Sequence, residues 1–399
     1  MAKKIAKKET KKETKKDAKK EVKKSSDKTD AIRLRLLKDF GVNAVVKGGD
    51  LEKCLYGRIP TGSVYLDVKL GGGIPIGKIT QISGNKSDGK STLADFIIKN
   101  AQTLDVKWVW TKRSYDKGRE SVEQFDREEN GIIVGYLDLE GTKDVYWSKE
   151  IGVDTDEVVY APPSGAEEAF NMAHTMQLAG VGLIVLDSVD ALVTMKEYDK
   201  DFGESSQMGG KQKLMGDFLR KFVATNIKLT REGKLPCTLI LINQVREKIG
   251  VMYGSPEFTP GGRAIGFYSA IDLRLRRGDW LIEGSGAEKR IVGQVIKFKT
   301  EKNKTFKQQQ TGDFDFYFDD TYDSTHKKAT IDNSKELVIL GIELGIIEKS
   351  GSWFRYKGEN LAQGAENTVK HLMYNKDKYE KIKEEIFKVL EDEKEGLDL

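Results

Sequence analysis

The chain has 399 residues, of which 38% are hydrophobic, so it is long enough to bury cores in two or three units. No apolar run approaches the ~20 residues of a membrane helix, and the lysine-rich amino terminus lacks the apolar stretch of a secretory signal, so we expect no membrane contact and a cytoplasmic location. Two cysteines, Cys54 and Cys237, are too few for a disulfide framework or a zinc site, and we expect reduced thiols.

The charge of the chain is unevenly distributed. Residues 1–28 contain thirteen lysines and five acidic residues, a charge of +8, which leaves −4 for the rest of a chain whose total is +4. Lysine pairs recur every four residues from Lys3 to Lys24, and such a stretch has almost nothing to bury. We predict a disordered tail over residues 1–29. It either only keeps the protein soluble or, as we favour, binds phosphates without sequence preference.

After the tail, the pattern changes to folded structure. Asp30 can cap a short helix that ends at Gly41, within a predicted oligomerisation segment over residues 30–58. Four apolar runs then alternate with helical segments, at Ile79–Ile82, Ile132–Leu137, Leu183–Leu186 and Thr238–Ile242. Because these runs lack polar alternation, they are typical of strands buried on both faces. They predict an α/β core over residues 59–330, with a mostly parallel sheet flanked by helices.

Two further segments complete the predicted organisation. The stretch Trp110–Asn130 is too charged for a core and indicates a surface insertion at about residues 110–130. Residues 331–399 predict a small α+β lobe with an acidic end. It contains an apolar helix around Leu337–Ile347, a hairpin-like segment at Gly351–Gly358, and a final amphipathic helix, Asp377–Leu390, capped by Asp377.

A phosphate-binding loop is the strongest motif in the chain. Residues Gly84–Ser91 fit the pattern G-x-x-x-x-G-K-[ST], between an apolar strand and a helix expected to start near Thr92. Backbone N–H groups of such a loop surround a phosphate chain, its lysine reaches the β- and γ-phosphates, and its hydroxyl holds Mg²⁺. The chain is therefore expected to bind ATP and Mg²⁺, through Gly84, Ser87, Asp88, Gly89, Lys90, Ser91 and Thr92. Lys86 and Asp88 occupy variable positions of the pattern, so their identities carry little information.

Acidic residues at the ends of two predicted strands are candidates for the second metal ligand and for the base that activates water. Asp187 ends the run that begins at Leu183 and is expected to hold the metal together with Ser91. Asp138 and Glu140 end another strand, and either could act on the attacking water, although an acidic strand end is more often a cap or a turn. We assign Glu140 as the base and Asp138 as a supporting residue.

These pieces, in this order, resemble the RecA family over roughly residues 30–390. The resemblance is carried by the entry segments Pro60–Asp67 and Leu70–Gly77, by the specific motifs Asn243–Gly254 and Pro260–Ala264, and by Gly351–Glu359, which is similar to the bacterial C-terminal lobe. It implies a RecA-type ATPase core with an N-terminal polymerisation helix. Glu140 then matches the water-activating glutamate, Lys90 a catalytic cation, Asp144 and Trp147 the adenine contacts, and Gln244 the γ-phosphate sensor.

The resemblance also implies two DNA-binding loops. The first covers about Tyr198–Met208 and leads into a helix near Gly209, and the second covers Val245–Gly262. Basic residues there would hold the backbone, apolar residues would wedge between bases, and glycines would let main-chain amides approach phosphates. The DNA-binding residues implied are Met208, Gly209, Lys213, Arg220, Arg246, Lys248, Ile249, Gly261, Gly262 and Arg263.

Some positions depart from the family pattern. Alignment on Phe306-Lys307-Gln308 places Lys299 at the first of two lysines that act on the neighbouring subunit's γ-phosphate, but it places Glu301 at the second. A shifted register would instead use Lys302 and Lys304. Arg263 stands where asparagine is usual. With the insertion and the tail, these departures indicate a diverged member of bacterial or phage origin.

The resemblance implies a DNA-dependent ATPase that forms helical filaments on single-stranded DNA and exchanges strands with a homologous duplex in recombination and repair. Two alternatives remain open. A ring-shaped hexameric helicase would lack the C-terminal lobe and the helix after Asp30, and a non-hydrolysing mediator would lack Lys90, Glu140 or Asp187. We expect the protein in the cytoplasm of a bacterium or of a phage-infected host.

Overall fold

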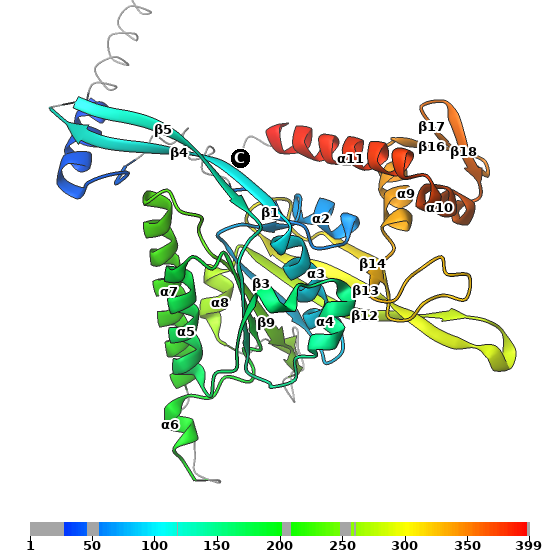
Figure 1. The fold of residues 1–399 in the computed structure, drawn as a ribbon, viewed down its shortest axis with the longest axis horizontal. Coiled ribbons are helices and arrows are strands. Elements are labelled where there is room, and N and C mark those ends of the chain that lie inside the picture. The colour runs from blue at the N-terminus through cyan, green and yellow to red at the C-terminus, as the bar shows by residue number, and fades with distance from the viewer. Residues whose placement is uncertain are drawn as a thin grey trace, which may run out of the picture. The chain divides into compact units, whose positions relative to one another are not determined.

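The computed structural model describes residues 28–45, 56–117, 119–201, 209–247, 257–258 and 261–396 (Figure 1). Nearly all of the predicted tail lies outside these residues, as do Met208, Lys248 and Ile249. The described residues form two compact units. One contains the described residues before 46 together with Lys107–Glu128 and Lys228–Lys234, and the other contains the remainder. Among the described residues, none of the helices is both long and apolar enough to span a membrane.

The larger unit is built on one nine-stranded sheet. In sheet order its strands are β15 (Thr330–Ile331), β14 (Thr311–Tyr317), β13 (Arg290–Asn303), β12 (Ile271–Glu283), β3 (Ile79–Gly84), β9 (Thr238–Gln244), β8 (Leu183–Asp187), β6 (Val134–Asp138) and β7 (Val158–Ala161). From β12 to β7 neighbouring strands are parallel, whereas β12, β13, β14 and β15 pair antiparallel. The predicted α/β core with a mostly parallel sheet is confirmed, and the four apolar runs all become central strands.

Both faces of the central strands are buried. In β9, Leu239 and Leu241 belong to the core that also includes α5 and α7, so the alternate residues Ile240 and Ile242 face the other side of the sheet. Phe170 of α5 stacks on Phe218 of α7 with ring centroids 4.3 Å apart, and Figure 1 shows these helices side by side. The helices of this unit's core are α2 (Val64–Leu70), α3 (Lys90–Gln102), α4 (Val145–Ile151), α5 (Ala166–Ala179), α6 (Met195–Tyr198), α7 (Gly210–Arg231) and α8 (Arg263–Tyr268).

Two pairs of two-residue strands also lie outside the large sheet. β1 (Arg58–Ile59) pairs with β2 (Ile74–Pro75), and β10 (Arg246–Glu247) pairs with β11 (Glu257–Phe258). β10 begins at Arg246, separated only by Val245 from Gln244 at the end of β9, and the β10–β11 pair forms the stem of the second predicted DNA loop. The polar stretch predicted as an insertion belongs to a hairpin of β4 (Asp105–Asp116) and β5 (Arg119–Asn130).

The C-terminal lobe has a small core of its own. It consists of α9 (Asn333–Glu343), a sheet of β16 (Ile347–Ser350), β17 (Trp353–Tyr356) and β18 (Glu359–Gln363), and then α10 (Ala365–Tyr374) and α11 (Lys376–Gly396). Leu337, Phe354, Leu372 and Ile386 are buried in its core. α10 was not predicted from the sequence.

Two predicted helix caps are wrong. Asp30 lies inside the helix over residues 28–40, where it pairs with Arg33, because the helix already includes residue 28. Asp377 lies in the first turn of α11, and Asn375 caps that helix by accepting a hydrogen bond from the Lys378 N–H at 3.2 Å. In both cases an acidic residue of the first turn resembles a cap, since both positions favour carboxylates.

A buried carboxyl group joins the lobe to the core. Glu336 of α9 accepts hydrogen bonds from the Ser63 hydroxyl and the Tyr65 N–H, both at 2.8 Å, at the start of α2. Burial raises the pKa of Glu336 from its ordinary value of 4.5 to about 8, although these two hydrogen bonds oppose the shift.

Replacing Glu336 with glutamine is expected to flatten the pH dependence of stability. Because the raised pKa keeps the proton on the folded protein, the contribution of Glu336 is fully present below pH 4.5 and is lost as the pH rises through about 8. The thermal midpoint of the nucleotide-free wild type should therefore fall more between pH 5 and pH 9 than that of E336Q. Glu343→Gln, at a more exposed position of the same helix, should behave like the wild type. Equal slopes for all three proteins would contradict this prediction.

Candidate functional site

The phosphate loop connects β3 to α3 at the carboxyl end of the sheet. α3 begins at Lys90, two residues before the predicted start near Thr92, and its N-cap Gly89 has a left-handed backbone with φ of 82°. The left-handed backbone favours glycine, and a Cβ at Gly89 would in addition lie 2.6 Å from Cδ1 of Ile296, which would have to move. The Lys90 ammonium donates to the Asn85 carbonyl at 2.7 Å. Burial lowers the pKa of Lys90, and the nearby carboxylates of Asp88, Asp187 and Glu140 oppose this shift.

Asp88 carries more information than the sequence pattern indicated. Its buried carboxylate accepts hydrogen bonds from the Asn85 N–H at 2.6 Å and from the Arg277 N–H of β12 at 3.1 Å. The side chain thus closes the loop on itself and fastens it to the neighbouring strand. The interpretation that its identity is uninformative is wrong, because a variable position of the motif can still hold the loop in shape.

Two oxygen ligands suited to Mg²⁺ lie together beside the loop. The Ser91 hydroxyl donates to Asp187 Oδ2 at 2.8 Å, and the Tyr136 hydroxyl donates to the same oxygen at 2.6 Å. Burial raises the pKa of Asp187, and these two hydrogen bonds oppose the shift. A buried carboxylate beside a hydroxyl is a donor set that a hard divalent cation would stabilise. Ser91 and Asp187 therefore fit the metal role predicted for them.

Glu140 meets two groups from neighbouring strands. Its Oε1 accepts a hydrogen bond from the Ser188 hydroxyl, at the end of β8, and another at 3.0 Å from the Gln244 amide, the last residue of β9. Asp138, by contrast, accepts from the N–H groups of Glu140 and Lys143 and from the Tyr160 hydroxyl. Asp138 thus shapes the loop that presents Glu140, which matches the supporting role predicted for it.

A buried ion pair ties this loop to α3, and sequence reasoning missed it. The Lys143 ammonium pairs with Asp95 of α3, and the two side chains are only 10% and 3% exposed. The ammonium also lies 4.4 Å from the ring centroid of Tyr136, and Asp95 accepts from the Ser148 hydroxyl at 3.1 Å. A lysine and an aspartate 48 positions apart give no local signal, so this pair could not be found from spacing.

Replacing Lys143 with methionine should lower the free energy of unfolding by about 3–5 kcal/mol, because the buried Asp95 carboxylate loses its partner. The double variant Asp95→Leu/Lys143→Met should recover most of that loss, since two apolar groups replace the pair. Urea unfolding of the nucleotide-free protein measures both. If the double variant were as unstable as the single one, the pair would not be the source of the loss.

The two predicted adenine contacts lie at the start of α4. Asp144 is its N-cap and accepts from the Trp147 N–H at 3.0 Å. The Trp147 ring meets Phe316 edge to face at 6.1 Å, and the Lys328 ammonium lies 5.6 Å from its centroid. Phe316 and Lys328 thus help to hold the aromatic side chain that was predicted to stack on the base, and neither was singled out from the sequence.

Comparison with known proteins agrees with this arrangement. Residues 29–112 and 121–323 match the model of the RecA N-terminal domain, and residues 335–391 match the RecA C-terminal domain. Protein RecA of Mycobacteroides abscessus is 36% identical over 365 residues, which cover 90% of this chain and 92% of that protein. Protein RecA of Cutibacterium acnes is 37% identical over 351 residues, 88% of each chain.

The chain belongs to the RecA family. Its members are DNA-dependent ATPases of recombination and repair, and this chain has that role and uses ATP. The predicted fold, family and enzyme class are confirmed, as are the predicted roles in recombination, repair, ATP binding and DNA binding. The family also implies DNA binding and filament formation. The roles of individual residues stay predictions.

Most of the described residues that were predicted to bind DNA lie on or beside α7 and α8 in this RecA-family chain. Gly262, the N-cap of α8, approaches Gln212 of α7 so closely that a Cβ would lie 2.8 Å from Cγ of that side chain. Lys213 and Arg220 are exposed and seven residues apart on α7, which places them on one face. Arg263 is exposed at the first turn of α8. Gly209 and Gly261 both have left-handed backbones that glycine favours.

Two residues beside this surface were missed. Asp190 Oδ2 accepts from Arg246 at 2.7 Å, and the Asp190 carbonyl accepts from the Lys211 ammonium at 2.8 Å. Asp190 therefore holds one predicted DNA-binding arginine and one additional lysine. Because Asp190 follows Asp187 by only three residues, it lies between the residue predicted to hold the metal and Arg246, which was predicted to bind DNA.

The lysines of the two alternative registers lie in different surroundings. Lys299 is exposed on β13, opposite Arg274 of β12, and lines a cavity of about 190 Å³ together with Glu301. Lys302 donates to the Ser269 carbonyl at 2.6 Å, and Lys304 donates to the Phe267 carbonyl at 3.2 Å, at the end of α8. Burial and the charge of Lys304 lower the pKa of Lys302. The role assigned to Lys299 stays a prediction.

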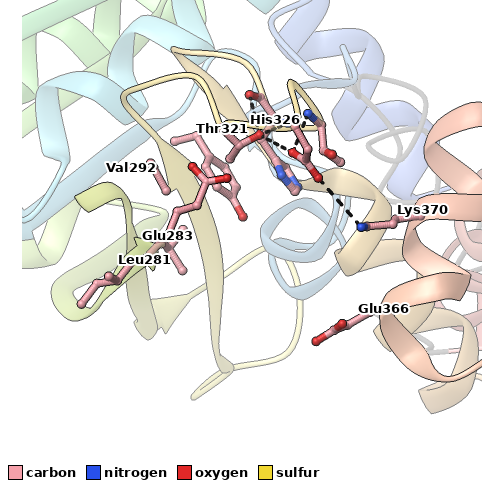
Figure 2. A pocket seen from close by; sticks show the side chains of 11 residues that line it. Leu281, Glu283, Val292, Thr321, His326, Glu366 and Lys370 are labelled. Atoms are coloured by element: carbon pink, nitrogen blue, oxygen red, sulfur yellow. Dashed lines mark hydrogen bonds and ion pairs between the residues drawn. The ribbon is translucent and has the colours of Figure 1, made fainter. Parts of the chain in front are cut away.

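A second cavity of about 440 Å³ lies at the junction between the sheet and the lobe, as Figure 2 shows. Glu283 and Val292 line it from the sheet, His326 from the loop before β15, and Glu366 and Lys370 from α10. The His326 ring is held by Tyr317, stacked at 4.1 Å, and by Asp332 at 3.0 Å. None of its lining residues belongs to the phosphate loop, so it is distinct from the nucleotide site.

Proposed function

We propose that this protein assembles on single-stranded DNA as a helical filament, with ATP and Mg²⁺ at the phosphate loop, and exchanges strands with a homologous duplex. The hydrogen bond between the Gln244 amide and the Glu140 carboxylate carries this proposal. It connects the group assigned to activate water with Gln244, which ends β9 two residues before the β10–β11 stem of the second predicted DNA loop begins at Arg246. Because the known relatives are bacterial proteins, we place its action in the cytoplasm of a bacterium or of a phage-infected host.

The hydrogen bond between Gln244 and Glu140 can connect the ATP site with the predicted DNA loop. Glu140 follows β6, Gln244 ends β9, and Lys90 follows β3, so all three lie at the carboxyl-end edge of the sheet. The γ-phosphate of a bound nucleotide would lie at this edge, beside Lys90. A phosphate oxygen there would compete with Glu140 for the Gln244 amide, which can donate to either. A change of partner would shift the stem that begins at Arg246, so that nucleotide state and DNA affinity change together.

The DNA surface supports binding without sequence preference. Lys213, Arg220, Arg246 and Arg263 are exposed cations, and the backbone amides at the starts of α7 and α8 are suited to phosphate oxygens. In the described state Arg246 is paired with Asp190. We propose that DNA phosphate replaces Asp190 as the partner of Arg246, so that DNA binding and the loop stem influence each other.

The first test is ATP hydrolysis with and without single-stranded DNA. We expect a low basal rate that single strands stimulate strongly, and then strand exchange between a single strand and a homologous duplex. Hydrolysis that ignored DNA in a protein that still bound it would overturn the coupling and favour a mediator. DNA-stimulated hydrolysis with unwinding but no strand exchange would favour a helicase instead.

Replacing Gln244 with alanine should separate the two activities. The variant loses the contact with Glu140 but keeps the phosphate loop, so basal hydrolysis should stay within a few-fold of the wild type while stimulation by single-stranded DNA falls about tenfold or more. Gln308→Ala, an exposed glutamine on a loop between strands, is the matched control and should behave like the wild type. Normal stimulation in Gln244→Ala would show that the contact does not transmit the signal.

A further inference from the structure

The hairpin of β4 and β5 contains residues that the family model passes over. That model matches residues as far as 112 and again from 121, so residues 113–120 at the hairpin tip are an addition to the RecA N-terminal domain. Below the tip the hairpin is ordered by its own side chains. Trp110 packs against Phe125 with centroids 5.3 Å apart, and the Arg127 guanidinium lies within 6 Å of both rings, at 5.6 Å and 5.7 Å. The added residues at the tip are therefore carried by a hairpin whose two strands are held together by packed side chains.

The added residues hold the segment that carries the N-terminal helix. Glu120 pairs with Arg33 of helix 28–40 at 2.6 Å and with Arg113 of β4 at 3.2 Å, and all three side chains are less than 15% exposed. Just after the helix, Asn43 donates its N–H to the Arg113 carbonyl at 2.9 Å and accepts from the Arg113 N–H at 2.7 Å. We call these four residues the clasp. Two of them, Arg113 and Glu120, are the first and last residues of the addition.

Helix 28–40 has apolar side chains on a second face as well. Leu37 is buried, on the side where Arg33 meets the clasp. Ile32, Leu36 and Phe40 follow one another at four-residue spacing, which places them in one stripe along the helix. Ile32 is 63% exposed and Phe40 is 71% exposed. A helix that is apolar on two sides is normally covered on both, and here the Leu37 side is buried while Ile32 and Phe40 are exposed.

We propose that the clasp, half of which lies in the added residues 113–120, holds helix 28–40 folded and in place before assembly. This is the polymerisation helix that the family resemblance implied, so Ile32 and Phe40 then present a preformed surface to a second copy of this chain. The inference rests on the proposed function, because the second copy is the next subunit of the filament. A family whose members form filaments joins its subunits by head-to-tail contacts, in which an exposed surface of one copy is met by a different surface of the next. Holding the helix ready reduces the ordering that each added subunit would require.

The expected effect follows from the fraction of subunits whose helix is ready to dock. The apparent affinity of an interface falls in proportion to that fraction, so a clasp variant in which about a tenth of the helices are in place should assemble about tenfold more weakly. Two independent variants open the clasp. Glu120→Gln removes the anion between Arg33 and Arg113, and Asn43→Gly removes the side-chain contact at a residue whose φ of 53° suits glycine.

The experiment uses the full chain and has two readouts. Hydrogen exchange of residues 28–40 is measured without DNA or nucleotide, and the protein concentration for half-maximal assembly is measured by sedimentation on single-stranded DNA with a slowly hydrolysed ATP analogue. Glu123→Gln, an exposed carboxylate on the same strand as Glu120, is the matched control. Ile32→Glu changes the exposed stripe, and glutamate in the first half of a helix does not oppose the helix dipole.

We expect both clasp variants to exchange faster in residues 28–40 and to need about tenfold more protein for assembly, and Glu123→Gln to match the wild type. Ile32→Glu should lose assembly while its helix exchanges normally. Unchanged exchange in the clasp variants, faster exchange with normal assembly, or normal assembly of Ile32→Glu would each overturn the inference. A wild type that did not assemble on single-stranded DNA would instead refute the proposed function, together with everything that rests on it.

Discussion

Replacing Lys90 with alanine is expected to lower the ATP turnover number by about 10²–10³-fold, because a positioned donor to developing negative charge contributes about that much to catalysis. The Lys90 ammonium is buried at the start of α3 and is held by the Asn85 carbonyl at 2.7 Å. It is therefore already directed into the loop before a nucleotide arrives. Loss of this cation should also weaken ATP binding, so that DNA binding supported by ATP falls along with hydrolysis.

The matched control for this variant lies in the same loop. Lys86 is exposed at a variable position of the motif, and Lys86→Ala removes the same charge and nearly the same volume from the loop. Its turnover should stay within a few-fold of the wild type. Equal losses in the two variants would mean that the overall charge of the loop matters and that the position of Lys90 does not. The steady-state rate in excess single-stranded DNA is the measurement to compare.

The nucleotide site could be predicted from the sequence because its parts are local. The phosphate loop is eight consecutive residues, and Asp187 ends a run of apolar residues that is typical of a buried strand. Parallel strands bring their carboxyl ends to the same edge of a sheet, so Asp138, Asp187 and Gln244 had to meet there once β6, β8 and β9 were recognised. The assigned function of Glu140 needed the family resemblance, since an acidic strand end alone has several structural explanations.

The contacts that hold the site in shape could not be predicted in the same way. Lys143 and Asp95, Asp88 and Arg277, and the clasp between helix 28–40 and the hairpin join segments far apart in the chain. Each depends on which side chain a turn happens to direct inward, and periodicity says nothing about that. The hairpin of β4 and β5 is a further example of a contact that the sequence did not predict. Its charges predicted a surface position, but its pairing with the N-terminal segment needed the folded structure.

Replacing Glu140 with glutamine is expected to lower hydrolysis by about 10²–10⁴-fold, the range that a positioned general base contributes. Glutamine keeps the size of the side chain and can still accept from the Ser188 hydroxyl through its carbonyl oxygen. The phosphate loop, Asp187 and the cation at Lys90 are unchanged, so ATP should still bind. The two most damaging substitutions therefore differ in what they leave intact, since Lys90→Ala weakens the ATP state and Glu140→Gln traps it.

This difference gives a sharp comparison. If ATP binding strengthens the hold on DNA and hydrolysis releases it, Glu140→Gln should dissociate from single-stranded DNA more slowly than the wild type in ATP, whereas Lys90→Ala should dissociate faster. Dissociation into excess competitor DNA measures both, and Glu157→Gln, an exposed glutamate before β7, controls for loss of a carboxylate. Hydrolysis that persisted in Glu140→Gln would transfer the role of base to another group. If Glu140→Gln lost hydrolysis but dissociated from DNA at the wild-type rate, the Gln244 contact would respond to bound ATP. Hydrolysis would then not be the step that weakens the hold on DNA.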